Sequence, residues 1–122
     1  MPILVVEIVT RPQEKLAPSL PKVLADITGE IFGSQAGGTW VRLHTLPADR
    51  YAEGPGESGE YFPVFVTVLK ASLPSAEVLQ AEVARLTRAI ARACARPEEN
   101  VHIVYQPAAS GRVAFGGRLV RE

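Results

Sequence analysis

The chain has 122 residues, of which 47% are hydrophobic, and its 13 basic side chains are balanced by 13 acidic ones. This length predicts a single domain over residues 1–122, and the balanced charge argues against a nucleic-acid partner. No apolar run is long enough for a membrane span or a signal peptide, so we expect a protein of the cytoplasm with no membrane association.

The first half of the chain reads as strand, helix and strand. Residues 3–10 are β-branched and end at Arg11-Pro12, which predicts a mostly buried strand. Apolar residues then recur at helical spacing from Leu16 to Ile31 before Gly33, with a regular helix beginning as late as Ser19 because two prolines precede it. The alternating run 40–46 predicts a second strand, with Arg42 and His44 on one face.

Residues 53–60 are rich in glycine and glutamate and predict a connection between two structured halves. Residues 54–59 also satisfy the dinucleotide-binding spacing G-x-G-x-x-G. Strand-like residues follow instead of a helix, and Pro55 removes an amide from the loop, so we reject a phosphate site here.

The second half repeats the pattern. Residues 62–70 predict a strand, and Ser75 can cap a helix that ends before Pro97. The apolar stripe of this helix consists of Leu79, Val83, Leu86 and Ile90. Residues 101–105 predict the fourth strand, with His102 and Val104 on the same face.

The two halves share one offset, which indicates internal repeats over 1–56 and 61–122. Pro2 and Pro63 are separated by 61 positions, as are Gly56 and Gly117, and Val41 and Val101 by 60. We therefore predict an α+β (α/β) fold in which two β-α-β units form a four-stranded sheet with both helices on one face. The opposite face is expected to be apolar and buried by other subunits.

Pro2 is the main candidate for chemistry. Methionine before proline is normally removed, which would leave a secondary amine held rigidly at the edge of a strand. The pKa of an α-amino group is ordinarily near 8, and burial or a nearby cation lowers it, so such an amine can act as a base near neutral pH. The two histidines, His44 and His102, lack partners at metal-ligand spacing, so neither a metal nor another cofactor is predicted.

The chain resembles the tautomerase superfamily, which includes 4-oxalocrotonate tautomerase and macrophage migration inhibitory factor. The likeness rests on Pro2-Ile3 entering a strand, on the segment 39–42, and on the glycine-flanked aromatic tail 111–117. It implies a fused double β-α-β form that assembles as a homotrimer. It also implies that Pro2 is the general base and that Arg42 polarises an oxo or carboxylate oxygen of the substrate.

Five further residues are candidates for substrate binding under this resemblance. Arg11 lies near the family's second carboxylate-binding arginine, and Phe115 matches an aromatic residue of the active-site wall. From the second half, which has no N-terminal amine because Phe62 and Pro63 are internal, we expect polar groups such as Lys70, His102 and Arg112. One working proline per chain is the consequence.

The resemblance implies a cofactor-independent isomerase that transfers a proton within a small carboxylated 2-oxo or 2-hydroxy-dienoic acid. One alternative is a hydratase or decarboxylase in which a protonated Pro2 acts as an acid. The other is an oligomeric binding protein that has the fold without the chemistry. Retention of Met1 would make the Pro2 nitrogen an amide and exclude both catalytic readings.

Overall fold

The computed structural model describes residues 2–57 and 59–121, and each half of the chain forms a β-α-β unit. The first unit consists of β1 (Ile3–Thr10), α1 (Leu20–Phe32) and β2 (Trp40–Pro47), and the second of β3 (Val64–Leu69), α2 (Ala76–Cys94) and β4 (Val101–Tyr105). The strands are parallel within each unit. Two short 3-10 turns, at Ala48–Arg50 and Glu98–Asn100, precede the third and fourth strands.

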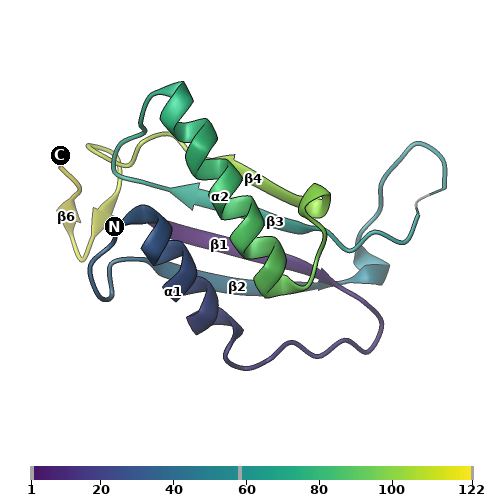
Figure 1. Ribbon diagram of the computed structural model, residues 1–122. Helices are drawn as coiled ribbons and strands as arrows, with labels where there is room; N and C mark the ends of the chain where they lie inside the picture. The colour runs from purple at the N-terminus through teal and green to yellow at the C-terminus, as the bar shows by residue number, and fades with distance from the viewer. Residues whose placement is uncertain (1, 58, 122) are drawn as a thin grey trace.

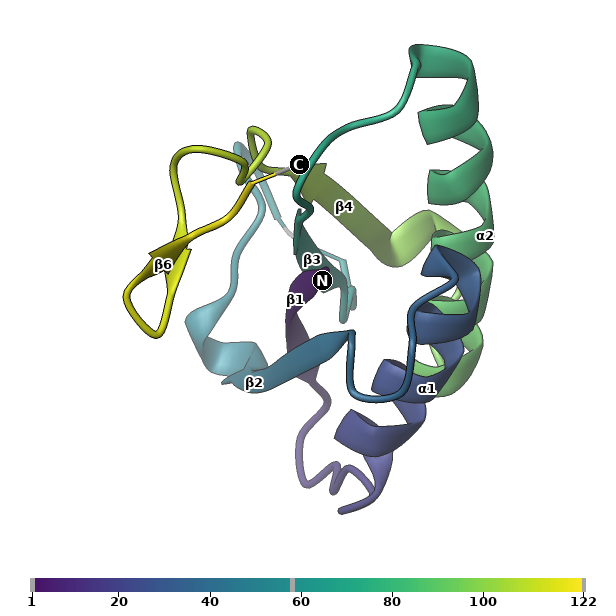
Figure 2. The same ribbon diagram turned by 90° about the vertical axis from the view of Figure 1, so that its left-hand side faces the viewer.

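The two units join along β1 and β3 to form one sheet with the strand order β2-β1-β3-β4. The junction is antiparallel, with Ile3 opposite Leu69, Val6 opposite Val66 and Ile8 opposite Val64. The start of β1 therefore lies beside the end of β3. Both helices cover the same face of the sheet, as Figures 1 and 2 show. This arrangement is the predicted α+β fold.

The helix ends follow local chemistry. Ser19 precedes α1 and Pro21 occupies its first turn, while Gly33 ends it with φ 68°, a left-handed conformation that costs glycine little. The Ser75 side chain accepts a hydrogen bond from the Val78 amide at the start of α2. Pro97 lies two residues beyond the left-handed Ala95 that ends α2.

The core lies between the sheet and the two helices. Alternate residues of the central strands point into it, together with side chains from both helices, and all are fully or almost fully buried: Leu4, Val6, Ile8, Val64, Val66, Val68, Leu24, Leu86 and Ile90. Burial of these aliphatic side chains between the sheet and the helices is the main source of stability. A single β-α-β unit could not bury its own apolar face as well, so each unit depends on the other.

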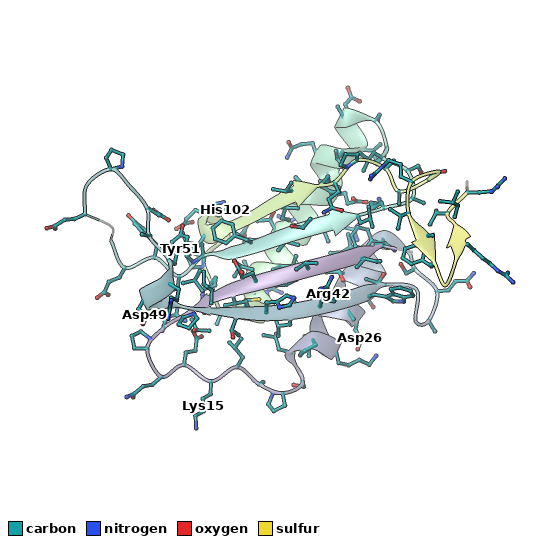
Figure 3. All side chains as sticks on the ribbon, turned by 180° about the vertical axis from the view of Figure 1, so that it is seen from behind. Lys15, Asp26, Arg42, Asp49, Tyr51 and His102 are labelled. Atoms are coloured by element: carbon teal, nitrogen blue, oxygen red, sulfur yellow. The ribbon has the colours of Figure 1, made fainter. Side chains whose placement is uncertain are left out.

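The face of the sheet that the helices leave open is mixed, so the expectation of an apolar face was wrong. One row across the four strands consists of His44, Glu7, Phe65 and His102, as the strand register defines it. The same face carries Arg42 on β2 and Val104, which is 63% exposed, on β4. Figure 3 looks onto this face, with Arg42 and His102 on the outer strands.

The chain after β4 forms a small hairpin of β5 (Ala114–Phe115) and β6 (Arg118–Leu119). Figure 2 shows that it extends away from the helices, on the open side of the sheet. The Phe115 ring meets the Trp40 ring edge-on, with 5.4 Å between the ring centroids, which ties the hairpin to the start of β2. Neither helix in the described part of the chain is long and apolar enough to cross a membrane.

Candidate active site

Pro2 is buried at the end of the sheet, immediately before β1. Its carbonyl oxygen accepts a hydrogen bond of 3.0 Å from the Trp40 amide, which fixes it against β2. Pro2 lines a pocket of about 320 Å³ with residues from the end of α1 and from the end of β3: Phe32, Gly33, Ser34, Gln35, Lys70, Ala71 and Ser72. The antiparallel pairing of β1 with β3 brings Lys70 to this position.

Lys70 is the cation of the Pro2 pocket. Its Nζ donates to Glu82 Oε1 on α2 at 2.8 Å and lies 5.2 Å from the centroid of the Phe32 ring. The side chains of Lys70 and Glu82 are only 18% and 12% exposed. A pair shielded in this way is less screened by water than a surface ion pair.

Tyr105, the last residue of β4, completes this cluster. Its hydroxyl donates to Glu82 Oε2 at 2.7 Å, so each oxygen of the carboxylate has one partner. Burial raises the pKa of Tyr105, and the hydrogen bond to Glu82 raises it further. The phenol therefore stays protonated at neutral pH and serves as a donor.

Arg42 does not reach the Pro2 pocket of its own subunit. It lies on β2 opposite Val5, and its exposed side chain belongs to the open face (Figure 3), whereas Pro2 and Lys70 lie at the helix-covered side of the strand end. A single chain thus keeps the two residues predicted to be catalytic apart.

Arg11 lies at the opposite end of β1 from Pro2. Eight strand residues separate them, a span of roughly 30 Å at the rise of an extended chain. Its guanidinium carbon is 5.3 Å from the centroid of the Phe62 ring, and its Nη1 donates to Glu14 at 3.2 Å. It lines a separate pocket of about 530 Å³ together with Tyr51, Tyr61, Phe62 and the carboxylates of Glu53 and Glu60.

The other three candidates also lie outside the lining of the Pro2 pocket. His102 is exposed on the open face, with 5.6 Å between its ring centroid and that of Phe65. Arg112 donates from Nε to the Ala108 carbonyl and from Nη2 to the Pro107 carbonyl, which stabilises a turn. Phe115 contacts Trp40, whose amide donates to the Pro2 carbonyl.

Sequence reasoning missed Glu82, Tyr105 and Phe32. The first had a usable signal, because Glu82 falls between Leu79 and Leu86 within the apolar stripe of α2, where a carboxylate needs a partner. Tyr105 and Phe32 read as ordinary core residues in the sequence. In the ranges 2–57 and 59–121, no three His, Cys, Asp or Glu side chains gather as a metal ion would require.

Comparison with solved structures gives the fold a name. The chain aligns with a fused 4-OT, described as the wild-type F6 asymmetric trimer, with a TM-score of 0.77 and 18% identity over 96% of this chain and 94% of that one. It also aligns with macrophage migration inhibitory factor from Trichinella spiralis, with a TM-score of 0.72 and 12% identity over 97% and 99%.

A third similar structure is FG41 malonate semialdehyde decarboxylase inhibited by 3-bromopropiolate, with a TM-score of 0.67 and 18% identity over 93% of this chain and 88% of that one. No protein-family model and no curated protein sequence matches the chain. The chain therefore has the fold of the tautomerase superfamily, in its fused, two-unit form.

Proposed function

We propose that the protein is a cofactor-independent tautomerase in which Pro2, freed by removal of Met1, is the general base. Met1 itself lies outside the described residues. The observation that carries the proposal is that Pro2 is buried at a pocket of about 320 Å³ whose lining includes Lys70. Burial and a neighbouring cation both lower the pKa of an amine, which favours the neutral, proton-accepting form.

The proposed reaction moves one proton between two atoms of a small carboxylated 2-oxo or 2-hydroxy-dienoic acid. The Pro2 nitrogen takes the proton from the enol oxygen or from the carbon beside the carbonyl, and the electron pair left behind shifts along the conjugated system. The Lys70 ammonium stabilises the negative oxygen with its free N–H groups. The Pro2 ammonium then returns the proton to the other end of the system, so the base is regenerated.

Arg42 enters this proposal through a second copy of the chain. The fused 4-OT structures are described as trimers, and the open face of this chain exposes Val104 and Trp40, which a neighbouring subunit would cover. In a homotrimer an open-face arginine can approach the strand end of its neighbour. We propose that Arg42 completes the pocket of the adjacent subunit and binds a substrate carboxylate there.

A decarboxylase is the second candidate, because the chain shares its fold with a malonate semialdehyde decarboxylase. In that reaction a protonated Pro2 would stay cationic at neutral pH and assist the loss of CO2 from a 3-oxo acid. The dependence of kcat/KM on pH separates the two candidates. A base loses activity below the pKa of the Pro2 amine, whereas an acid loses activity above it.

The test begins with the intact mass of the natively expressed protein, which should correspond to the chain without Met1. Ketonisation of phenylenolpyruvate and of 2-hydroxymuconate is then followed by absorbance. We expect Pro2→Ala to lower kcat at least 100-fold, Lys70→Met to lower kcat as well because the negative oxygen loses its cation, and Arg42→Ala chiefly to raise KM. Equal rates in wild type and Pro2→Ala, or a retained Met1, would leave the non-catalytic binding protein as the remaining interpretation.

A further inference from the structure

Glu82 is a carboxylate that joins three elements beside the Pro2 pocket. It projects from α2 to Lys70 at the end of β3 and to Tyr105 at the end of β4, with contacts of 2.8 and 2.7 Å. Building on the proposed tautomerase function, we propose that Glu82 is a positioning residue: it holds the Lys70 ammonium in the Pro2 pocket and tunes the basicity of the Pro2 amine.

The hydrogen bonds of this cluster leave Lys70 available to a ligand. An ammonium group has three donors, and Glu82 takes one of them. The Phe32 ring packs on another side of Nζ, at 5.2 Å from its centroid, where a cation is favourable. Lys70 is thus held by two partners, and as a lining residue of the hollow that it shares with Pro2 it keeps donors that Glu82 does not use.

The charges around the amine are unevenly placed, which gives Glu82 its influence. Lys70 lines the Pro2 pocket and Glu82 does not, so the cation acts on Pro2 more directly than the anion that balances it. Along α2 the next charged residue is Arg85, which is exposed and lines a separate hollow with Arg88 and Arg92. From α1 the neighbour at this end is the uncharged Phe32.

Stability alone gives little reason for such a cluster. Desolvation of a lysine and a glutamate offsets most of their attraction, and apolar side chains of similar volume often serve equally well. Glu82 also occupies the apolar stripe of α2, where leucine would pack against the neighbouring core. A role in the pocket accounts for a carboxylate at this position, and that role can be measured separately from folding.

The direct test is an NMR titration of the Pro2 amine in protein without Met1, labelled with ¹⁵N-proline. Glu82→Gln keeps a hydrogen-bond acceptor for Lys70 and removes the charge. We expect it to lower the pKa of the Pro2 amine by about 1, because the Lys70 cation is then unbalanced. Glu82→Asp keeps the charge and should return the pKa toward the wild-type value.

The matched control is Asp26→Asn. Asp26 forms the same kind of pair with Lys22, at 2.6 Å, but on the exposed surface of α1. This variant should leave the amine pKa unchanged. A wild-type pKa in Glu82→Gln, in a folded protein, would overturn the inference.

If Glu82→Gln does not fold, the double variant Lys70→Met with Glu82→Leu removes both charges and keeps the volume. In the wild type the Lys70 cation acts on Pro2 more directly than Glu82, so the pair as a whole lowers the pKa of the Pro2 amine. Removing both charges should therefore raise that pKa above the wild-type value, and an unchanged pKa would overturn the inference. Phenylenolpyruvate turnover separates the two proposals: turnover that does not depend on Pro2 contradicts the tautomerase, whereas Pro2-dependent turnover with an unmoved amine pKa contradicts only the role of Glu82.

Discussion

Arg96 is a buried arginine whose hydrogen bonds join three distant parts of the chain. Only 5% of it is exposed, and its guanidinium makes five hydrogen bonds. It donates to both oxygens of Glu14 and to the carbonyls of Val9, Phe62 and Cys94. The side chain therefore links the end of β1, the segment before β3 and the end of α2.

Replacing this side chain should destabilise the protein severely. Arg96→Met removes the five hydrogen bonds of the guanidinium and leaves the Glu14 carboxylate with only its two Arg11 donors, so we expect it to reduce the free energy of unfolding by about 3–5 kcal/mol. Urea denaturation measures the change. The matched control is Arg88→Met, at an exposed position, which should change the free energy of unfolding by less than about 0.5 kcal/mol. A loss below about 1 kcal/mol would contradict the assigned role.

Glu14 makes the free energy of unfolding depend on pH in the acidic range. Hydrogen bonds from Arg96 above all, together with the Arg11 amide, lower its pKa to about 2 from the usual 4.5. Because the pKa of Glu14 is lower in the folded state, its contribution to the free energy of unfolding is complete above the unfolded-state pKa. That contribution is lost as the pH falls through the folded-state pKa. Between pH 5 and pH 2 we expect a loss on the order of 2 kcal/mol from this group.

The comparison that isolates this effect is Glu14→Gln. Its unfolding free energy, measured by urea denaturation across the same pH range, should fall less steeply with acid than that of the wild type. Parallel curves for the two proteins would place the acid sensitivity elsewhere.

Arg96 could not be found from the sequence. It stands between a helix and Pro97, where a charged residue is normally solvated. Apart from the nearby Cys94 carbonyl, its partners are 34 to 87 positions away. Pro2 and Lys70 could be named in advance because a family resemblance pointed to them, but their shared pocket could not, because it depends on how the two units join.

At the scale of the elements, the end of α2 offers a stabilising change. Ala95 adopts a left-handed conformation with φ 56°, which strains any residue that has a Cβ. Ala95→Gly should raise the melting temperature and add about 0.5–1 kcal/mol to stability. The same substitution at exposed Ala84 inside the helix should cost about 1 kcal/mol. A destabilised Ala95→Gly would show that Cβ contacts outweigh the strain.

Local patterns predicted the elements well, since each reflects a periodicity carried by its own residues. The β-branched run 3–10 and the strand pattern of 101–105 matched β1 and β4, and Ser75 caps α2 as expected. The antiparallel union of β1 with β3 had no local signal, because the residues of one strand do not say which strand pairs with it or in which direction. The mixed character of the open face was missed because strand alternation shows which residues share a face within one strand. It does not show which residues of different strands come together on that face.

At the scale of the whole molecule, the proposed trimer can be tested through its open face. Analytical ultracentrifugation should give a mass near three times the 13.1 kDa of one chain. Val104→Asp places a charge at a site that is 63% exposed in the single chain, so it should yield folded monomers if a neighbour covers that site. Val78→Asp, on the exposed side of α2, should remain trimeric. Trimeric Val104→Asp would place the interface elsewhere.

The antiparallel junction between β1 and β3 also has a consequence for how the sequence of such a chain can diverge. It gives the molecule two ends with a similar order of elements. Pro63 has its nitrogen committed to a peptide bond, whereas Pro2 would present an amine once Met1 is removed, as proposed above. If Pro2 is the base as proposed, two units joined in one chain have one reactive end, whereas two separate units would have two. Under the proposed function, the end that includes Arg11 and Tyr61 takes no part in proton transfer, so substitutions should accumulate there more freely than around Pro2.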